Sequence, residues 1–125
     1  QDHPENSVAY TSLGQIRYLS TLKYVDGIVG NSSSGIIEAP SLETGTVNIG
    51  DRQRGRARAA SVIDCKLDSG RIKEAIAQIF DLDYKKKLES VVNPYGDGHA
   101  SDKIVKILSS IDINDRKWYV KQKLC

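Results

Sequence analysis

The stretch that decides the fold runs from Val25 to Pro40 and reads VDGIVGNSSSGIIEAP. The short apolar run Gly27–Gly30, rich in β-branched residues and bounded by glycines, predicts a buried strand of a parallel sheet. Three serines follow this strand, and the pattern then predicts a helix over 35–42. Ligands of open α/β sheets lie at the carboxyl ends of strands, where helix N-termini offer unpaired N–H groups. The stretch therefore predicts both a fold class and a place for an anion.

The rest of the chain alternates between strand-like and helix-like apolar periods. We predict three further strands, over 7–10, 46–49 and 60–64. We predict four further helices, over 15–24, 70–80, 81–91 and around 104–111, with a short extra helix over 115–123. Strands that alternate with helices indicate an α/β fold, a Rossmann-like three-layer parallel sheet with helices on both faces. Four strands are few for a complete doubly wound domain.

Composition excludes several classes of protein. The 125 residues suffice for one domain, and 18 Lys and Arg against 16 Asp and Glu give a formal charge of +2. Such a weak and mixed charge argues against a nucleic-acid partner. The apolar runs are only a few residues long, so no segment is expected to span a membrane.

The start of the sequence and its two cysteines indicate the origin of the chain and its redox compartment. The sequence has no Met and no signal peptide, so we expect an excerpt of a longer protein or a cleaved chain. Cys65 and Cys125 are the two cysteines, and their separation fits neither a disulfide scaffold nor a metal site. We expect a semi-buried thiol and a tail thiol in the reducing cytoplasm.

The serine loop, defined as residues 31–35, has the chemistry of an anion site. Ser32, Ser33 and Ser34 offer hydroxyl donors at low steric cost, and Glu38 is placed one turn later to accept bonds from a ribose diol. A P-loop is excluded because Ile36 and Ile37 stand where Lys and Ser/Thr are required. An ordinary helix cap, with a serine at the cap and a carboxylate a turn later, is the alternative interpretation.

The arginine segment, defined as residues 51–58, follows the next predicted strand. Its arginines at 52, 54, 56 and 58 alternate, so all four would face one anion if the segment were extended. Guanidinium groups bind phosphate oxygens in bidentate fashion. A solvated basic loop is the alternative. Beside the serine loop, this segment indicates a site for a nucleoside diphosphate, although neither the base nor the reaction follows.

Three ordered motifs resemble the hydrolysing UDP-N-acetylglucosamine 2-epimerase family of the sialic-acid biosynthesis type. They occupy residues 29–40, 47–56 and 93–100, and the resemblance covers nearly the whole chain. It implies the C-terminal, UDP-binding domain of a glycosyltransferase-B-type fold. It also implies that this domain, residues 1–125, is incomplete, because the N-terminal catalytic domain and the first βαβ of the C-terminal domain are absent.

The resemblance implies roles for five residues around the diphosphate and ribose. Ser32 and Ser33 correspond to residues that bind the diphosphate, and Glu38 to one that binds the ribose hydroxyls. Arg52 resembles the diphosphate arginine of the family, and Arg56 is a second candidate.

Weaker local similarity implies a uracil contact through the backbone of Leu13 and the ring of Tyr18, with a core aromatic as the alternative for Tyr18. The turn Asn93–Gly98 is expected to position the last helix, and His99 to be structural. No residue of this chain is expected to be catalytic.

The family's reaction eliminates UDP from UDP-N-acetylglucosamine to give 2-acetamidoglucal, and water then adds to yield N-acetylmannosamine. The implied partners are UDP, UDP-N-acetylglucosamine, the N-terminal domain of the same enzyme and a homo-oligomer, with no cofactor and no metal. This chain would bind UDP, the leaving group of the reaction. It would be part of an enzyme but inactive by itself. A glycosyltransferase of the same architecture and a non-catalytic flavodoxin-like binding module are the alternatives.

Overall fold

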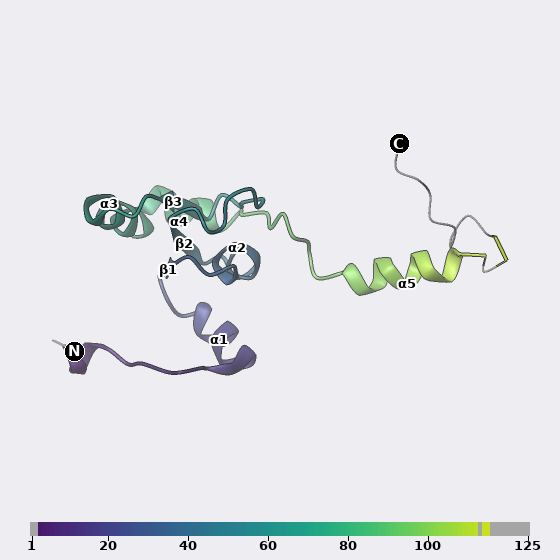
Figure 1. The fold of residues 1–125 in the computed structure, drawn as a ribbon, viewed down its shortest axis with the longest axis horizontal. Coiled ribbons are helices and arrows are strands. Elements are labelled where there is room, and N and C mark those ends of the chain that lie inside the picture. The colour runs from purple at the N-terminus through teal and green to yellow at the C-terminus, as the bar shows by residue number, and fades with distance from the viewer. Residues whose placement is uncertain (1–2, 113, 116–125) are drawn as a thin grey trace. The chain divides into compact units, whose positions relative to one another are not determined.

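The computed structural model of the chain describes residues 3–112, 114 and 115. They form two compact units, which divide between Tyr95 and Gly96. The first unit contains a sheet and the helices around it, with the 3₁₀ turn η1 (Pro4–Asn6) near its start. The second contains the helix α5 (Ala100–Ser110) (Figure 1). None of the helices within the described ranges has the length and apolar character needed to cross a membrane.

The sheet is parallel, as predicted, with β1 (Gly27–Gly30), β2 (Gly45–Ile49) and β3 (Val62–Cys65) in the order β1-β2-β3. Its register pairs Val29 with Val47, and Val47 with Ile63. The Rossmann-like α/β class is thereby confirmed, and the predicted strands over 46–49 and 60–64 are found within a residue or two of their expected limits.

The strand predicted over 7–10 is wrong, so the described sheet has three strands instead of four. The backbone is extended at Ser7, with φ −141° and ψ 143°, but no strand is assigned there. Val8 and Tyr10 are 74% and 65% exposed. A strand needs a partner for its N–H and C=O ladder, and the local β preference of these residues cannot supply one.

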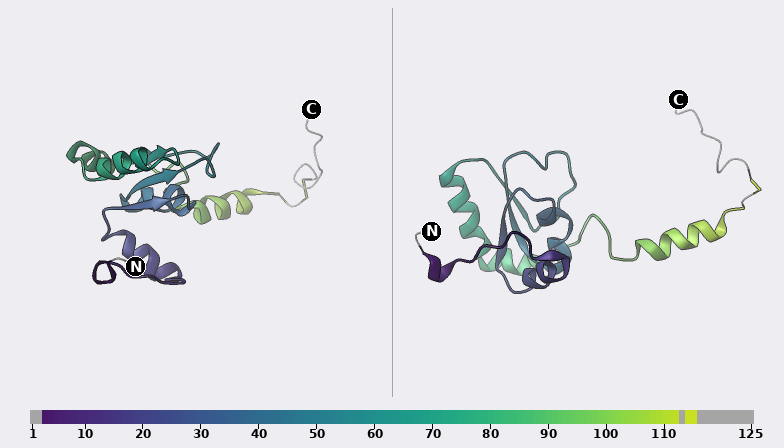
Figure 2. Two further views of the ribbon diagram at one scale, coloured as in Figure 1. Left: turned by 60° about the vertical axis from the view of Figure 1, so that its left-hand side comes forward. Right: turned by 60° about the horizontal axis from the view of Figure 1, so that its bottom comes forward.

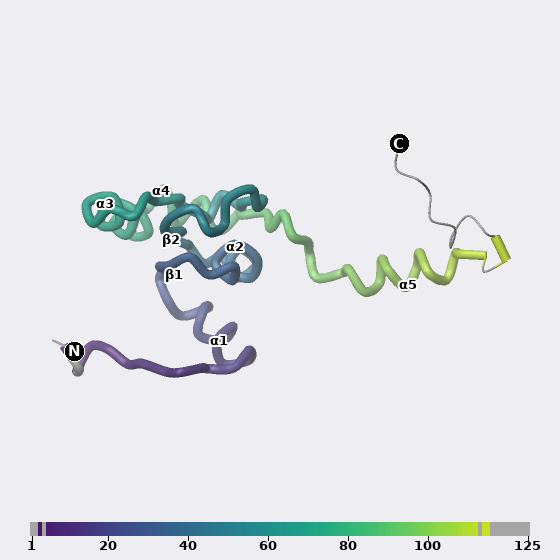
Figure 3. The backbone as a smooth tube through the Cα atoms, in the orientation of Figure 1, coloured from purple at the N-terminus to yellow at the C-terminus, as the bar shows by residue number. Residues whose placement is uncertain are grey.

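Helices cover both faces of the sheet. Successive side chains of β2 point to opposite faces, so neighbouring residues of this strand contact different helices. Val47 packs in a core with α3 (Ser69–Ile79) and α4 (Leu82–Leu88). Thr46 contacts α2 (Ser34–Ile37), which lies across β2 from α3 in Figure 3. The core on the α3 side comprises Val47, Cys65, Ala75, Ile79, Tyr84 and Leu88. The Cys65 thiol is buried, and Cys125 lies outside the described residues.

Most predicted helices are confirmed, with limits shifted by up to four residues. They are α1 (Gly14–Leu22), α3, α4 and α5. Figure 2 shows α1, α3 and α4 from two further sides. Asp68 and Asp81 cap α3 and α4 by accepting bonds from the N–H groups of Arg71 and Tyr84, each at 2.9 Å. The short helix predicted over 115–123 lies outside the described residues, apart from Asp115.

The single helix predicted over 35–42 is wrong. The structure has α2, which ends at Ile37, and then the 3₁₀ turn η2 (Ala39–Leu42). Pro40 explains the break, because it has no N–H to continue the α-helical ladder and its ring disfavours helical geometry before it. The break ends α2 beside Glu38, whose N–H still bonds to the Ser34 carbonyl at 3.0 Å.

Candidate functional site

The serine loop connects β1 to α2 at the carboxyl edge of the sheet. Ser33 occupies the N-cap position of α2, but its side chain makes no capping bond. The Ser32 hydroxyl instead accepts from the Ser34 N–H at 3.3 Å. The alternative interpretation of the serine loop as an ordinary helix cap is therefore wrong. Because α2 is only four residues long, its dipole is small, and hydroxyl and loop N–H groups are the donors available to an anion.

Glu38 follows α2, one turn after Ser34, as its spacing predicted. Its side chain is exposed, and Ser32 is exposed as well, whereas Ser33 is half-buried. These three predicted site residues therefore lie on one short segment, with two of them open to solvent. A hydroxyl pair followed one turn later by a carboxylate can pair with both a phosphate and a diol.

The arginine segment is coiled into turns, so the prediction that all four arginines face one anion is wrong. The Arg54 N–H donates to Asp51 O at 2.8 Å, and the Arg56 N–H donates to Gln53 O at 3.3 Å. The guanidinium of Arg58 is turned inward, with its Nε 2.7 Å from Asp64 Oδ2. The turns form because local hydrogen bonds satisfy backbone groups that an extended loop would leave to water.

Asn31 joins the arginine segment to the serine loop. Arg52 Nη1 donates to Asn31 Oδ1 at 3.4 Å, and Gln53 Nε2 donates to Asn31 O at 2.7 Å. The predicted arginine thus lies beside the predicted serines, although they are about 20 positions apart in the chain. Arg56 is exposed in the same segment. Gln53, which is 3% exposed, was missed by sequence reasoning, and its one sign was an uncharged side chain among arginines.

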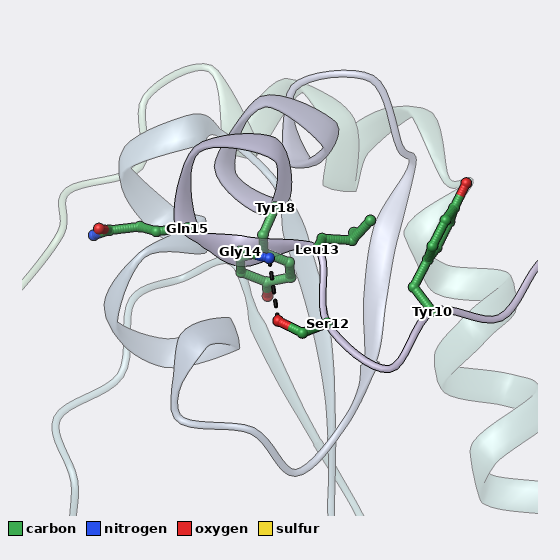
Figure 4. Close-up of a pocket in the computed structure, with 6 residues that line it drawn as sticks. All are labelled: Tyr10, Ser12, Leu13, Gly14, Gln15 and Tyr18. Carbon is green, nitrogen blue, oxygen red and sulfur yellow. Dashed lines mark hydrogen bonds between the residues drawn. The ribbon is translucent and has the colours of Figure 1, made fainter.

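The two residues predicted to contact uracil line one pocket of about 550 Å³ (Figure 4). Leu13 and Tyr18 share it with Tyr10, Ser12, Gly14 and Gln15. The Ser12 hydroxyl fixes the turn by accepting from the Gly14 N–H at 3.2 Å. Tyr18 is half-buried and lies outside the core cluster, so the core-aromatic alternative is not borne out. No residue of the serine loop or arginine segment lines this pocket.

The turn Asn93–Gly98 makes contacts that the sequence did not predict. Asn93 Nδ2 donates to Ile37 O at 2.8 Å and to Ser41 Oγ at 2.6 Å. The Tyr95 hydroxyl donates to Ala57 O at 3.1 Å. Asn93 therefore secures the end of α2, and Tyr95 secures the arginine segment, within the first unit.

The end of this turn does act on the last helix, as predicted. Asp97 Oδ1 accepts from the His99 N–H, which precedes α5, and from Lys103 Nζ, each at 3.1 Å. The bond from the His99 backbone, followed by that from Lys103, lowers the pKa of Asp97 below its ordinary value. The exposed ring of His99 lies 3.5 Å from Asp102 Oδ2 and makes no capping bond to α5, so the structural role of His99 stays a prediction.

Comparisons with known proteins show which sequences the chain resembles. The family model for UDP-N-acetylglucosamine 2-epimerase matches residues 1–109. The chain is 42% identical over 102 residues to the polysialic acid biosynthesis protein P7 of Escherichia coli, covering 82% of this chain and 26% of that protein. It is 36% identical over 106 residues to the GDP/UDP-N,N'-diacetylbacillosamine 2-epimerase (hydrolyzing) of Campylobacter jejuni, covering 85% and 27%.

A third relative is the UDP-N,N'-diacetylbacillosamine 2-epimerase (hydrolyzing) of Legionella pneumophila, 33% identical over 115 residues that cover 92% of this chain and 29% of that protein. The chain thus spans between 26% and 29% of the length of these three relatives. Because the family model covers most of the sequence, the chain belongs to the UDP-N-acetylglucosamine 2-epimerase family.

Proposed function

We propose that this chain is the UDP-binding part of a hydrolysing UDP-N-acetylglucosamine 2-epimerase, which converts UDP-N-acetylglucosamine to N-acetylmannosamine and UDP. The observation that carries the proposal is the junction at Asn31, which sets the Arg52 guanidinium beside the serine loop. Family membership supports the reaction class. Two relatives with hydrolyzing 2-epimerase in their names support the involvement of water.

The proposed site divides UDP into parts with different chemical requirements. Arg52 and the hydroxyls of Ser32 and Ser33 would take the diphosphate, with Arg56 adding positive charge at the rim. The exposed carboxylate of Glu38 would accept from the ribose hydroxyls. Leu13 and Tyr18 would hold the uracil in the pocket of Figure 4, where an apolar side chain and a tyrosine ring suit a flat base and polar groups lie beside them.

In this proposal the chain acts on the leaving group rather than on the sugar protons. Elimination of UDP builds negative charge on the diphosphate, and donors already in place lower the energy of that charge in the transition state. Proton transfer would come from carboxylates in another part of the polypeptide, the N-terminal domain implied by the family. No catalytic role is assigned to the residues of this chain.

The sugar is where a second candidate arises. Two relatives carry N,N'-diacetylbacillosamine in their names, so the UDP derivative of that sugar is the alternative substrate. Product analysis of the natural polypeptide that carries this chain, without any acceptor, separates the candidates. Free N-acetylmannosamine and UDP from UDP-N-acetylglucosamine are expected. Turnover of the diacetylbacillosamine derivative alone would favour the second candidate, and a requirement for an acceptor would favour a glycosyltransferase.

Arg52→Ala is expected to weaken UDP binding by on the order of 2 kcal/mol, about 30-fold, because it removes a charged partner of the diphosphate. Isothermal titration calorimetry of the natural polypeptide with UDP gives the measurement. Arg54→Ala is the matched control, since it removes the same charge from the same segment at an exposed position without a proposed ligand contact. Its affinity should stay within about twofold of the wild type.

Equal UDP affinity in Arg52→Ala and wild type would overturn the assignment of Arg52. Equal losses in the Arg52 and Arg54 variants would show that only the summed charge of the segment attracts UDP. If UDP fails to bind the wild type, the proposed function itself is wrong.

A further inference from the structure

One of the four arginines holds the arginine segment together from within. Arg58 Nη1 donates to Arg56 O at 2.7 Å, and Arg58 Nη2 donates to Gln53 O at 3.2 Å. Its third nitrogen, Nε, lies 2.7 Å from Asp64 Oδ2 in an ion pair. All three guanidinium nitrogens therefore face partners within the protein, two through hydrogen bonds and Nε through the ion pair alone, and the side chain is only 26% exposed. A guanidinium suits this bridging role, because one planar group presents several N–H donors in fixed directions.

The carboxylate that receives Arg58 is itself fixed to the sheet. Asp64 belongs to β3, and its Oδ1 accepts from Asn48 Nδ2 at 2.7 Å. Asn48 lies opposite Asp64 in the register of β2 and β3 and is 1% exposed. The chain of contacts from Asn48 through Asp64 to Arg58 thus connects the rigid sheet to the backbone carbonyls of the arginine segment.

The same segment is tied to the serine loop at its other end. The buried side chain of Gln53 donates to Asn31 O, while the Gln53 carbonyl accepts a hydrogen bond from Arg58 Nη2. Arg52 precedes Gln53 directly, so the backbone of Arg52 is joined to a residue that is held on both sides. A change at Arg58 would therefore reach Arg52 through Gln53, and a change at Asp64 would reach it through Arg58 and Gln53.

We propose that Arg58 and Asp64 are positioning residues, which hold the arginine segment so that Arg52 stays beside the serine loop. The inference rests on the proposed function, because it gives the placement of Arg52 a use in binding the diphosphate. Arg58 contributes through its hydrogen-bond geometry rather than as an anion ligand. Binding sites whose side chains are held by such outer partners lose less entropy when the ligand arrives.

A purely electrostatic role for these two residues predicts different results, and two variants separate the roles. Asp64→Asn removes a negative charge, so electrostatics alone would strengthen UDP binding. Positioning predicts weaker binding, by about tenfold, since the ion pair that anchors Arg58 is lost. Arg58→Lys keeps the charge but cannot reproduce two directed hydrogen bonds together with the ion pair, and positioning again predicts a loss of about tenfold.

The order of the segment is measured without UDP by limited trypsin digestion of the natural polypeptide, followed by mass spectrometry. Cleavage after Arg52, Arg54 and Arg56 should become about tenfold faster in Asp64→Asn and Arg58→Lys. Cleavage after Lys73 and Lys87, in α3 and α4, should not change, which excludes global unfolding. Glu74→Gln is the matched control, because it breaks the exposed pair between Arg71 and Glu74 on α3 with the same change of charge.

The two readouts keep the inference separate from the proposed function. Faster cleavage of the segment with weaker UDP binding supports the positioning role. Unchanged cleavage in both variants, or tighter UDP binding by Asp64→Asn, would overturn it. If the wild type does not bind UDP, both the proposed function and the role of Arg52 in binding the diphosphate are wrong. The cleavage rates then report only whether the Arg58 guanidinium orders the arginine segment.

Discussion

Replacing Gly35 by alanine is expected to destabilise the protein by about 2–3 kcal/mol, because the new methyl group has no room. A Cβ at this position would lie 2.5 Å from Thr46 Cγ2 and 3.1 Å from Thr46 Oγ1. Thr46 cannot easily move aside, since it is 2% exposed and its hydroxyl donates to the Gly35 carbonyl at 2.9 Å. The strain would be relieved by lifting α2 from β2. Ser33 and Glu38 would move with it, so UDP binding should weaken as well.

Urea denaturation measures the loss of stability, and a second substitution tests its cause. Thr46→Ser removes Cγ2 and keeps the hydroxyl, so Gly35→Ala with Thr46→Ser should recover most of the stability lost by Gly35→Ala. Gly70→Ala is the matched control in α3, where the nearest atom to a new Cβ is the Asp68 carboxylate at 3.2 Å. It should not destabilise by more than about 0.5 kcal/mol, since alanine favours helix. No rescue by Thr46→Ser would mean that the close approach of α2 to β2 is not the cause.

The close approach at Gly35 also shows why this part of the fold could be predicted from sequence. A glycine-bounded apolar run followed by small residues marks β1 and the serine loop through local preferences alone. The structure places both where the sequence predicted them. The strand predicted over 7–10 fails for the opposite reason, since pairing depends on a neighbour that no local pattern reveals.

The candidate site was predicted in its residue types more than in its arrangement. Serines, Glu38 and arginines at neighbouring strand ends indicated an anion site, and Asn31 does join the two segments. The inward turn of Arg58 was not foreseen, because alternation predicts a common side only for an extended chain.

The supports of the site were invisible in the sequence because their partners are far apart along it. Gln53 bonds across 22 positions, Tyr95 across 38 and Asn93 across 56. None of these separations leaves a periodic pattern, so each contact follows only from the folded chain.

The largest loss of stability is expected from Tyr84→Ala, at about 3–5 kcal/mol, because it empties a filled position of the core. Tyr84 is 4% exposed and packs with Val47, Ile79 and Leu88 between α4 and the sheet. Its hydroxyl donates to Ser61 O at 2.7 Å, which ties α4 to the chain entering β3. Urea denaturation gives the free energy of unfolding. Tyr24→Phe is the control, since Tyr24 is 89% exposed, and should change stability by less than about 0.5 kcal/mol. A loss below about 1 kcal/mol in Tyr84→Ala would contradict the packing described here.

Tyr84→Phe isolates the hydroxyl, and we expect it to cost about 1 kcal/mol at pH 8. The cost is moderate because Ser61 O still accepts from the Thr46 N–H at 2.9 Å.

Burial raises the pKa of Tyr84 above its ordinary value of 10.0, against a smaller lowering by a backbone hydrogen bond with Thr46. The stability that the neutral hydroxyl contributes is therefore fully present below pH 10.0 and is lost as pH rises through the raised folded value. Wild type should lose more stability than Tyr84→Phe between pH 8 and pH ~11, so the gap between them should shrink. A gap that stays constant or widens over this range would show that the buried phenol does not resist ionisation.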